Sequence, residues 1–283
     1  MSTDQNQNQD QDPRRPGRSL EKGRELKLLN FIKTHPTLPS ITGNPDAIID
    51  LIEEFSQKYH FMTVGLPKGN IVTSIIAEQK PSTMIELGCY VGYSAILFGD
   101  AVRKAGGARY YSLELNSEFA EIAREIVQLA GLADFVTILV GRSDVLLNNL
   151  FESGEVESVE MLFIDHYKPA YTLDLKLCEQ LGKIIPGRSV IVADNVIFPG
   201  NPPYLEYVRS SVQEKRGEAE KGPVRAYELE GFDGRTVQSF MGAENAPRFE
   251  IVGDPNLVYE SVLRQPEGDR DAVEVTRCVG VEG

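Results

Sequence analysis

The sequence predicts an α/β protein with a Rossmann-like, doubly wound, mostly parallel sheet of seven strands, helices on both faces, and an antiparallel last strand. Two patterns support this fold class. From residue 83 onward, short apolar runs alternate with amphipathic segments, which is typical of parallel strands covered by helices on both sides. Near the carboxyl terminus, two strand candidates are separated only by "QPEGDRD", which predicts an antiparallel hairpin.

The apolar runs give the positions of the expected strands. The first five lie at 83–87, 109–113, 136–140, 159–164 and 189–193, and the last two at 257–263 and 272–278. Amphipathic segments between them predict helices at 93–105, 118–130, 143–151, 171–182 and 203–212. Right-handed crossovers then place these helices on both faces of one sheet.

Ahead of the alternating region, the sequence predicts helices at 19–33, at 69–79, and from Asn44 onward, where Asn44 is the N-cap and Pro45 the first helical residue. The first 18 residues are rich in Gln, Asn and Asp, and we expect a disordered tail there. Residues 19–283 are expected to form one domain. Its parts are helices over 19–80, a core over 83–212, a charged surface insertion over 213–256 and a hairpin over 257–283.

Composition excludes several classes of partner. The 283 residues carry a formal net charge of -13, which argues against nucleic acid or an anionic membrane as the main partner. The cysteines Cys89, Cys178 and Cys278 form no CxxC pair, so neither a zinc site nor a disulfide framework is indicated. The N-terminal stretch lacks the apolar core of a signal peptide, and no apolar run approaches a membrane span. A soluble protein of the reducing cytoplasm is expected.

A glycine-containing loop follows the first strand of the alternating region. In "ELGCYVGYSA", Gly88 and Gly92 stand at a strand-to-helix turn, where the backbone can approach a ligand closely. Glu114 ends the next strand, where a carboxylate can accept the hydroxyls of a ribose. Because the GxGxxG pattern of dinucleotide sites is missing, these residues favour S-adenosylmethionine as the ligand. Alternatively, the glycines serve close packing and Glu114 is a solvated acid at a helix start.

Two later strands both end in oxygen-bearing side chains. "MLFIDHYK" ends in Asp165, with Lys168 three residues later, and "VIVADN" ends in Asp194 and Asn195. Carboxylate and amide oxygens suit a hard divalent cation. Taken singly, each strand end has a simpler explanation, because Asp165 can cap a helix and Asp194-Asn195 can form an Asx turn.

The motifs together resemble those of catechol O-methyltransferases, which are class I, S-adenosylmethionine-dependent and metal-dependent enzymes. The resemblance covers roughly residues 44 to 212, and more loosely the last two strands. It is carried by "FMTVGLPKG", "ELGCYVGYSA", "LELN", "VGRS", "LFIDHYK" and "ADNVIFPG". The pairing of the last two motifs is the most specific part, because in this family they hold the metal and the general base.

The resemblance implies a role for each strand end. The strands ending at Asp165 and Asp194 are expected to be neighbours, with Asp165, Asp194 and Asn195 as ligands of Mg²⁺. Two oxygens of a catechol-type acceptor would complete the coordination, and the metal would lower the pKa of the bound hydroxyl. Lys168 is expected to be the general base, with its own pKa lowered by the nearby cation. Its neighbour His166 is expected to pack beside the adenine of the cofactor.

The same resemblance implies the cofactor and acceptor residues. Lys68 is expected in the same loop as Met62 and Val64. The implied contacts with S-adenosylmethionine are Met62, Val64, Glu86, Gly88, Tyr90, Gly92, Ser94, Glu114, Ser143, Asp165 and His166. For Glu86, an acid paired within its own strand is an equally good interpretation. The implied acceptor contacts are His60, Tyr167, Lys168, Asn195 and Pro199.

The chain departs from the family on the acceptor side. It contains no tryptophan, and His60 and Tyr167 stand where the animal enzymes clamp the acceptor ring with tryptophans. Arg264 aligns with a glutamate that binds the second catechol hydroxyl, and Glu260 is the nearest substitute. The acceptor is therefore a catechol or another vicinal dihydroxy aromatic of flavonoid or caffeoyl type. A non-catalytic S-adenosylmethionine-binding protein is the alternative. A monomer is the favoured oligomeric state.

Overall fold

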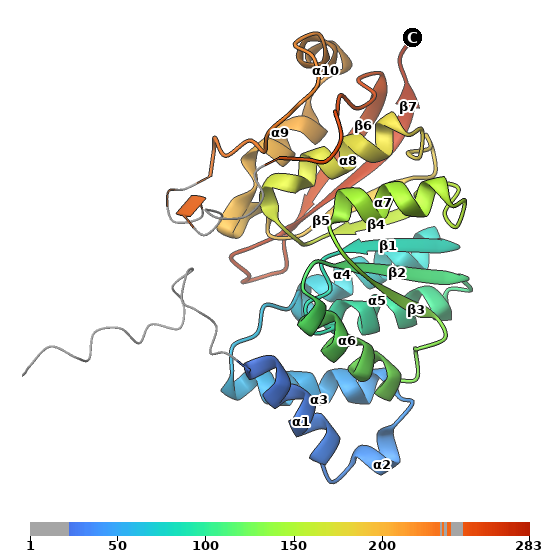
Figure 1. Ribbon diagram of the computed structural model, residues 1–283, viewed down its shortest axis with the longest axis vertical. Helices are drawn as coiled ribbons and strands as arrows, with labels where there is room; N and C mark the ends of the chain where they lie inside the picture. The colour runs from blue at the N-terminus through green and yellow to red at the C-terminus, as the bar shows by residue number, and fades with distance from the viewer. Residues whose placement is uncertain (1–22, 233, 235–236, 239–245) are drawn as a thin grey trace, which may run out of the picture.

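The computed structural model describes residues 23–232, 234, 237–238 and 246–283, so the predicted tail lies outside the described residues (Figure 1). One seven-stranded sheet with the order β3-β2-β1-β4-β5-β7-β6 organises the chain. Its strands are β1 (Thr83–Leu87), β2 (Arg109–Glu114), β3 (Val136–Val140), β4 (Met161–Ile164), β5 (Val190–Ala193), β6 (Leu257–Arg264) and β7 (Val273–Val281).

The predicted fold class is confirmed. Pairing is parallel from β3 through β5, and β7 inserts antiparallel between β5 and β6. In the β4–β5 ladder, Ile164 lies opposite Ala193, so the residues after them leave the sheet side by side. The predicted neighbourhood of the strands that end before Asp165 and Asp194 is therefore also confirmed.

Helices cover both faces of the sheet, as Figure 1 shows. One face packs against α1 (Arg24–Thr34), α3 (Pro45–Lys58), α4 (Gly65–Gln79), α5 (Tyr93–Lys104) and α6 (Ser117–Leu129). The other packs against α7 (Ser143–Glu152), α8 (Tyr171–Gln180) and α9 (Pro202–Arg209). Along β1, Met84 belongs to the first core cluster and Ile85 to the second, as the two-residue period of a strand requires.

Several helix boundaries differ from the prediction. The third predicted helix begins at Gly65 rather than 69, so Lys68 lies in the first turn of α4 and not in the loop with Met62 and Val64. The helix predicted at 203–212 ends at Arg209, and α10 (Val212–Ala219) follows as a separate helix inside the predicted insertion. Ser211 caps α10 in a capping box with Glu214. This motif indicates a helix start, although the residues after it lack a clear apolar periodicity. A one-turn helix, α2 (Leu38–Ile41), also forms within the proline-containing linker.

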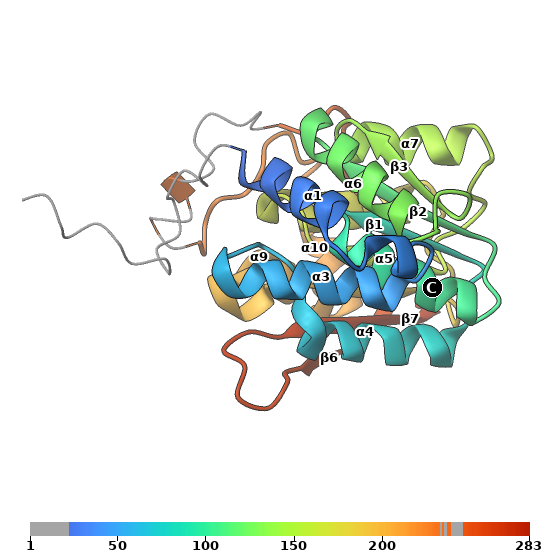
Figure 2. The ribbon, with the colours of Figure 1, turned by 90° about the horizontal axis from the view of Figure 1, so that it is seen from below.

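The turn between β6 and β7 lies at the same end of the molecule as α9 (Figure 2). Asp271 in this turn accepts hydrogen bonds from the backbone N–H groups of Ile197 and Phe198, at 3.2 and 2.9 Å. The hairpin is thereby attached to the loop that follows β5. Within the described residues, no helix is long and apolar enough to cross a lipid bilayer.

Gly88 marks the closest approach of two loops at the carboxyl edge of the sheet. Its φ is +96°, and a Cβ atom there would lie 2.4 Å from the carbonyl oxygen of Asp165. Gly154 also has a positive φ, of +75°, but a Cβ atom there meets nothing within 4 Å. A side chain would therefore meet only backbone strain at Gly154, but both backbone strain and a steric clash at Gly88.

We expect Gly154→Ala to lower the free energy of unfolding by about 1 kcal/mol, because only the left-handed backbone is strained. Gly88→Ala should cost about 3 kcal/mol or more, because the strain is joined by a clash with backbone that cannot move freely. Urea denaturation of both variants measures the difference. Equal losses for the two variants would contradict the close approach at Gly88.

Candidate active site

The candidate site lies at the carboxyl ends of β2, β1, β4 and β5, which are consecutive neighbours in the sheet. The loops that follow these strands carry most of the predicted residues. The backbone N–H of Asp165 donates to the carbonyl of Leu87, and that of Asp194 donates to the carbonyl of Ile164, both at 2.9 Å. Parallel pairing therefore continues just past the strand ends and sets the loops in register.

The glycine loop is held by Glu114. One oxygen of this carboxylate accepts from the backbone N–H groups of Cys89 and Tyr90, at 3.1 and 2.8 Å, and the other accepts from Asn116 N at 2.8 Å. Glu114 is only 9% exposed, so it is not the solvated acid of the alternative interpretation. It shapes the loop on which Tyr90 adopts a φ of 48°. Any ligand hydroxyl that binds Glu114 must share these two oxygens with the backbone N–H groups.

Glu86 is a buried acid that forms no ion pair with any residue that the structure describes. Ser112 on β2 donates to one of its oxygens at 2.5 Å, while its Oε1 atom receives no hydrogen bond within the described part of the chain. Burial, opposed by the hydrogen bond from Ser112, raises the pKa of Glu86 to about 7. The unpaired oxygen is suited to an ammonium group brought by a ligand.

Lys168 and the predicted metal ligands form a tight cluster. The Lys168 Nζ atom donates to Asp165 Oδ1 at 2.9 Å and to Asn195 Oδ1 at 2.8 Å. It also donates to the hydroxyl of Tyr171 at 2.6 Å. The oxygens of the loops after β4 and β5 thus converge on one point, where they surround a cationic group.

Asp194 is the most buried of the predicted metal ligands, at 1% exposure. Burial, with the negative charge of Asp165 next, raises its pKa to about 7, against the lowering effect of Lys68. Asp194 Oδ1 lies 2.6 Å from Lys68 Nζ, close enough for an ion pair but without hydrogen-bond geometry. Lys68 Nζ also contacts Asp271 Oδ2 at 2.6 Å.

These contacts bear on whether a divalent cation fits. Three carboxylates, those of Asp165, Asp194 and Asp271, are matched by the two ammonium groups of Lys68 and Lys168, which leaves negative charge in excess. Among the described residues, no group of three or more His, Cys, Asp or Glu side chains is arranged to hold a metal. The candidate set instead joins two carboxylates with an amide, a combination that suits Mg²⁺. The donor chemistry and the excess charge therefore fit a hard divalent cation.

His166 is held in a stacked and hydrogen-bonded position. Its ring stacks on Tyr171 with centroids 5.2 Å apart and planes 3° from parallel, and its Nε2 atom lies 2.7 Å from Asp174 Oδ2. Its buried Nδ1 atom has no partner in the described residues. Tyr171 therefore holds two residues of the loop after β4, because its ring stacks on His166 and its hydroxyl accepts a hydrogen bond from Lys168.

Several residues predicted to contact the acceptor or the cofactor are exposed. His60 and Pro199 are exposed, and Met62 is 55% exposed. Arg264, at the end of β6, is also exposed, and so is Glu260, four residues earlier in the same strand. The side chain from this hairpin that contacts the candidate site is that of Asp271.

Tyr167 connects the acceptor side to the insertion. Its ring meets Tyr227 edge to face, with centroids 5.4 Å apart. Arg142 donates to the Tyr227 hydroxyl at 3.1 Å and to the carbonyl of Ala246 at 3.0 Å. Arg142 also forms a two-pronged ion pair with the buried Asp144. Arg142 thus holds two parts of the insertion, one at Tyr227 and one at Ala246, against the start of α7, beside Ser143.

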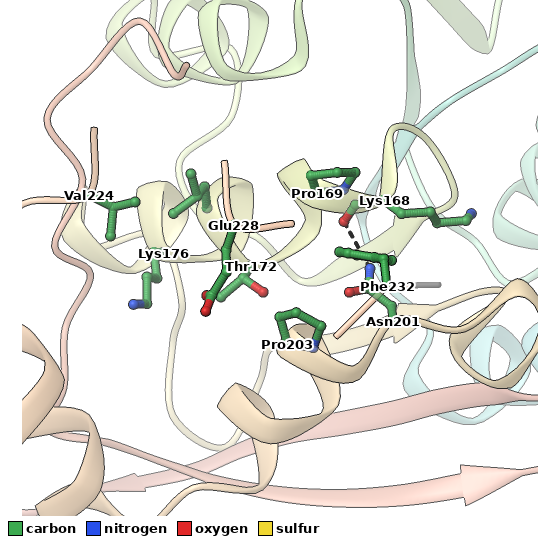
Figure 3. Close-up of a pocket in the computed structure, with 10 residues that line it drawn as sticks. Lys168, Pro169, Thr172, Lys176, Asn201, Pro203, Val224, Glu228 and Phe232 are labelled. Atoms are coloured by element: carbon green, nitrogen blue, oxygen red, sulfur yellow. Dashed lines mark hydrogen bonds between the residues drawn. The ribbon is translucent and has the colours of Figure 1, made fainter. Parts of the chain in front are cut away.

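A small cavity of about 50 Å³ lies between α8, α9 and the 224–232 segment (Figure 3). The Lys168 side chain runs away from the other labelled residues of this cavity, while its carbonyl accepts a hydrogen bond from Asn201 at 2.9 Å. The cavity therefore backs the Lys168 loop and is separate from the cluster around Lys168 Nζ.

Lys68, Tyr171 and Asp271 are members of the site with contacts that the sequence reasoning did not foresee. Tyr171 stands three residues after Lys168 at the start of α8, a spacing that offered a signal. Asp271 lies in a charged turn with no periodic pattern, far along the chain from β5. Only the insertion of β7 beside β5 brings it to Asn195.

Comparison with known proteins agrees with this geometry. The sequence pattern of a family described as O-methyltransferase matches residues 40–213. The chain is 37% identical to a catechol O-methyltransferase of Bos taurus over 200 residues, which cover 70% of this chain and 71% of the relative. It is 34% identical to a probable O-methyltransferase of Mycobacterium tuberculosis, covering 66% of this chain and 79% of the relative.

Solved structures support the fold. The O-methyltransferase TomG of Streptomyces achromogenes matches with a TM-score of 0.54 at 20% identity, covering 83% of this chain and 89% of that one. An O-methyltransferase of Bacillus cereus matches with a TM-score of 0.53 at 17% identity, covering 88% and 99%. With the match of the family pattern over more than half its length, this chain belongs to the O-methyltransferase family and is similar to catechol O-methyltransferases.

Proposed function

We propose that this O-methyltransferase transfers the methyl group of S-adenosylmethionine to a hydroxyl of a catechol-type small molecule. The observation that carries the proposal is the convergence of Asp165 Oδ1, Asn195 Oδ1 and Lys168 Nζ at the ends of β4 and β5. A proton-accepting amine and oxygen ligands lie together there, next to the glycine loop. A relative with the printed name catechol O-methyltransferase, 37% identical, supports the acceptor class.

The proposed cofactor site extends along the strand ends. The unpaired Oε1 of Glu86 would receive the ammonium of the methionine part, and Ser94, in the first turn of α5, would bind its carboxylate. Glu114 would bind the ribose hydroxyls. Ser143 and His166 would flank the adenine. The remaining proposed contacts are Met62, Val64, Gly88, Tyr90, Gly92 and Asp165.

Asp165, Asp194 and Asn195 would hold Mg²⁺, which, when bound, lowers the pKa of the acceptor hydroxyl and orients it. The excess of carboxylates over ammonium groups supports this assignment, as does the buried Oδ1 atom of Asp194, which has an ion pair with Lys68 but no hydrogen bond among the described residues. His60, Tyr167 and Pro199 would form the walls against the acceptor ring. Asn195 and Lys168 would contact its oxygens.

Lys168 is the proposed general base. In its neutral form, the Nζ atom takes the proton of the acceptor hydroxyl, and Tyr171 keeps the amine directed into the site. The oxygen then forms a bond to the methyl carbon while the carbon–sulfur bond breaks, and its electron pair stays on sulfur in S-adenosylhomocysteine. Alignment of the two reactants can contribute an effective molarity of about 10⁵ M or more.

The exposed His60 and the position of Arg264 also suit a related acceptor. A flavonoid or caffeoyl compound with vicinal hydroxyls would use the same base and oxygen ligands. The pairing of Tyr167 with Tyr227 of the insertion is the feature that favours a different ring wall from that of the animal enzymes. The cytoplasmic location and the monomeric state stay predictions.

Methyl transfer to a simple catechol should require Mg²⁺ and stop when EDTA is added. Asp165→Ala should lose activity, and Lys168→Met should lower kcat by about 10²- to 10⁴-fold, because the proton acceptor is removed. Radiolabelled methyl transfer measures the rate, and calorimetry measures cofactor affinity.

Lys221→Met, which removes an exposed lysine in the turn just after α10, is the matched control and should behave as wild type. Full activity of Lys168→Met would contradict the assignment of the base. Cofactor binding without turnover of any dihydroxy aromatic would favour a non-catalytic binding protein.

The affinity for S-adenosylmethionine should depend on the protonation of Glu86. Because the pKa of Glu86 in the free enzyme is about 7, the carboxyl is protonated below that pH and cannot pair with an ammonium. Affinity should therefore rise by up to about tenfold per pH unit as the pH increases toward 7, and then level off. Glu86→Gln should bind more weakly and lose this rise. Calorimetric titration across this range tests it, and an unchanged profile in Glu86→Gln would contradict the assignment.

A further inference from the structure

Asp271 is a buried carboxylate in the turn between β6 and β7, outside the loops that carry the predicted ligands. It is 5% exposed, and its pKa is held below the usual range by hydrogen bonds from Lys68, Phe198 N and Asn195. Burial alone would raise this pKa, so the donors around it outweigh the loss of solvent. Asp271 therefore has a definite set of partners, all of which donate hydrogen bonds to its two oxygens.

Each oxygen of Asp271 has a separate task. Oδ1 accepts from the backbone N–H groups of Ile197 and Phe198, which fixes the loop after β5. Oδ2 accepts from the side-chain amide of Asn195 at 2.9 Å and from Lys68 Nζ at 2.6 Å. One carboxylate thus joins the hairpin to α4 and to the loop after β5.

The hydrogen bond to Asn195 decides which end of its amide faces the site. A carboxylate can only accept, so it selects the Nδ2 end of Asn195. The Oδ1 atom is then directed toward Lys168 Nζ, 2.8 Å away, and into the cluster with Asp165. With the amide turned over, a donor would face the cluster, and a donor cannot bind a cation.

Lys68 links Asp271 to Asp194. Its Nζ atom lies 2.6 Å from Asp271 Oδ2 and 2.6 Å from Asp194 Oδ1. Since Lys68 is in the first turn of α4, its position is fixed by that helix. Asp271 therefore contacts, directly or through Lys68, both residues that the loop after β5 contributes to the proposed metal site.

We propose that Asp271 is the positioning residue of the divalent-cation site, which orients Asn195 directly and Asp194 through Lys68. This inference rests on the proposed function, because it requires Asp165, Asp194 and Asn195 to bind Mg²⁺. Asp271 does not touch the cluster oxygens that would bind the ion. Residues that hold a metal ligand in this way typically change metal affinity by about 10- to 100-fold when replaced.

The test is calorimetric titration of Mg²⁺ into the full chain with S-adenosylmethionine present. Asp271→Ser removes both acceptors and should weaken Mg²⁺ binding by about 10- to 100-fold. Asp271→Asn keeps the shape of the side chain but not its charge, and its affinity for Mg²⁺ should lie between those of Asp271→Ser and wild type. Affinity for S-adenosylmethionine, measured without Mg²⁺, should stay unchanged. Glu267→Gln, which alters an exposed carboxylate of the same turn, is the matched control and should bind Mg²⁺ as wild type.

The possible results separate this inference from the proposed function. If wild type binds Mg²⁺ and both Asp271 variants bind it equally well, the positioning role is wrong while the metal site stands. If Asp271→Ser is unfolded at the assay temperature, the result for Asp271→Asn decides. If wild type binds no Mg²⁺ with or without S-adenosylmethionine, the metal site and the role of Asp271 are both overturned. Loss of S-adenosylmethionine affinity along with Mg²⁺ affinity would indicate general disruption and would also overturn the proposal.

Discussion

The pairing of β4 with β5 is the constraint on which the candidate site depends. It brings Asp165 and Asp194 out of the sheet side by side, and burial of two neighbouring carboxylates is unfavourable unless cations neutralise them. Lys168 and Lys68 supply that charge from two directions, one from the loop after β4 and the other from α4. The N-terminal helices and the C-terminal hairpin are therefore tied to the same few atoms. Elements that are far apart in the sequence are held together by the need to compensate this charge.

The glycine loop is likewise held in place by a buried carboxylate, that of Glu114. Glu114 accepts backbone hydrogen bonds from Cys89 and Tyr90 and so determines the path of the chain between Gly88 and Gly92, while a third bond, from Asn116, holds its other oxygen. A group that shapes a loop so completely is already ordered before a ligand arrives, which reduces the entropy lost on binding. Glu86 differs, because one of its oxygens lacks a partner in the described residues. Of these two acids at adjacent strand ends, Glu114 orders the loop, while Glu86 is the one proposed to contact the cofactor.

Much of the fold was predictable, because strands buried on both faces and amphipathic helices leave strong periodic patterns. β1 and β3 have the predicted bounds, and the pairing that brings Asp165 beside Asp194 is confirmed. Lys68 was placed in a loop instead of the first turn of α4, because Gly65 and Pro67 resemble loop residues, although proline is compatible with an early helical position. Asp271 was missed for a different reason. Its importance comes from the antiparallel insertion of β7, a long-range contact that leaves no local sequence signal. The assigned roles of the site residues stay predictions.

The attachment of the 213–256 insertion has an evolutionary consequence. Its arms are tied to Arg142, Asp144 and the α8 residues Glu179 and Gln180, while Tyr227 reaches the ring of Tyr167. Substitutions within the insertion can therefore change the surroundings of the Tyr167 ring, which is proposed to face the acceptor, while the carboxylates and lysines at the ends of β4 and β5 keep their places. Under the proposed function, such a separation would let the acceptor selectivity change while the proposed base and oxygen ligands are kept. A segment with little regular structure of its own can in this way be the most adaptable part of an otherwise constrained enzyme.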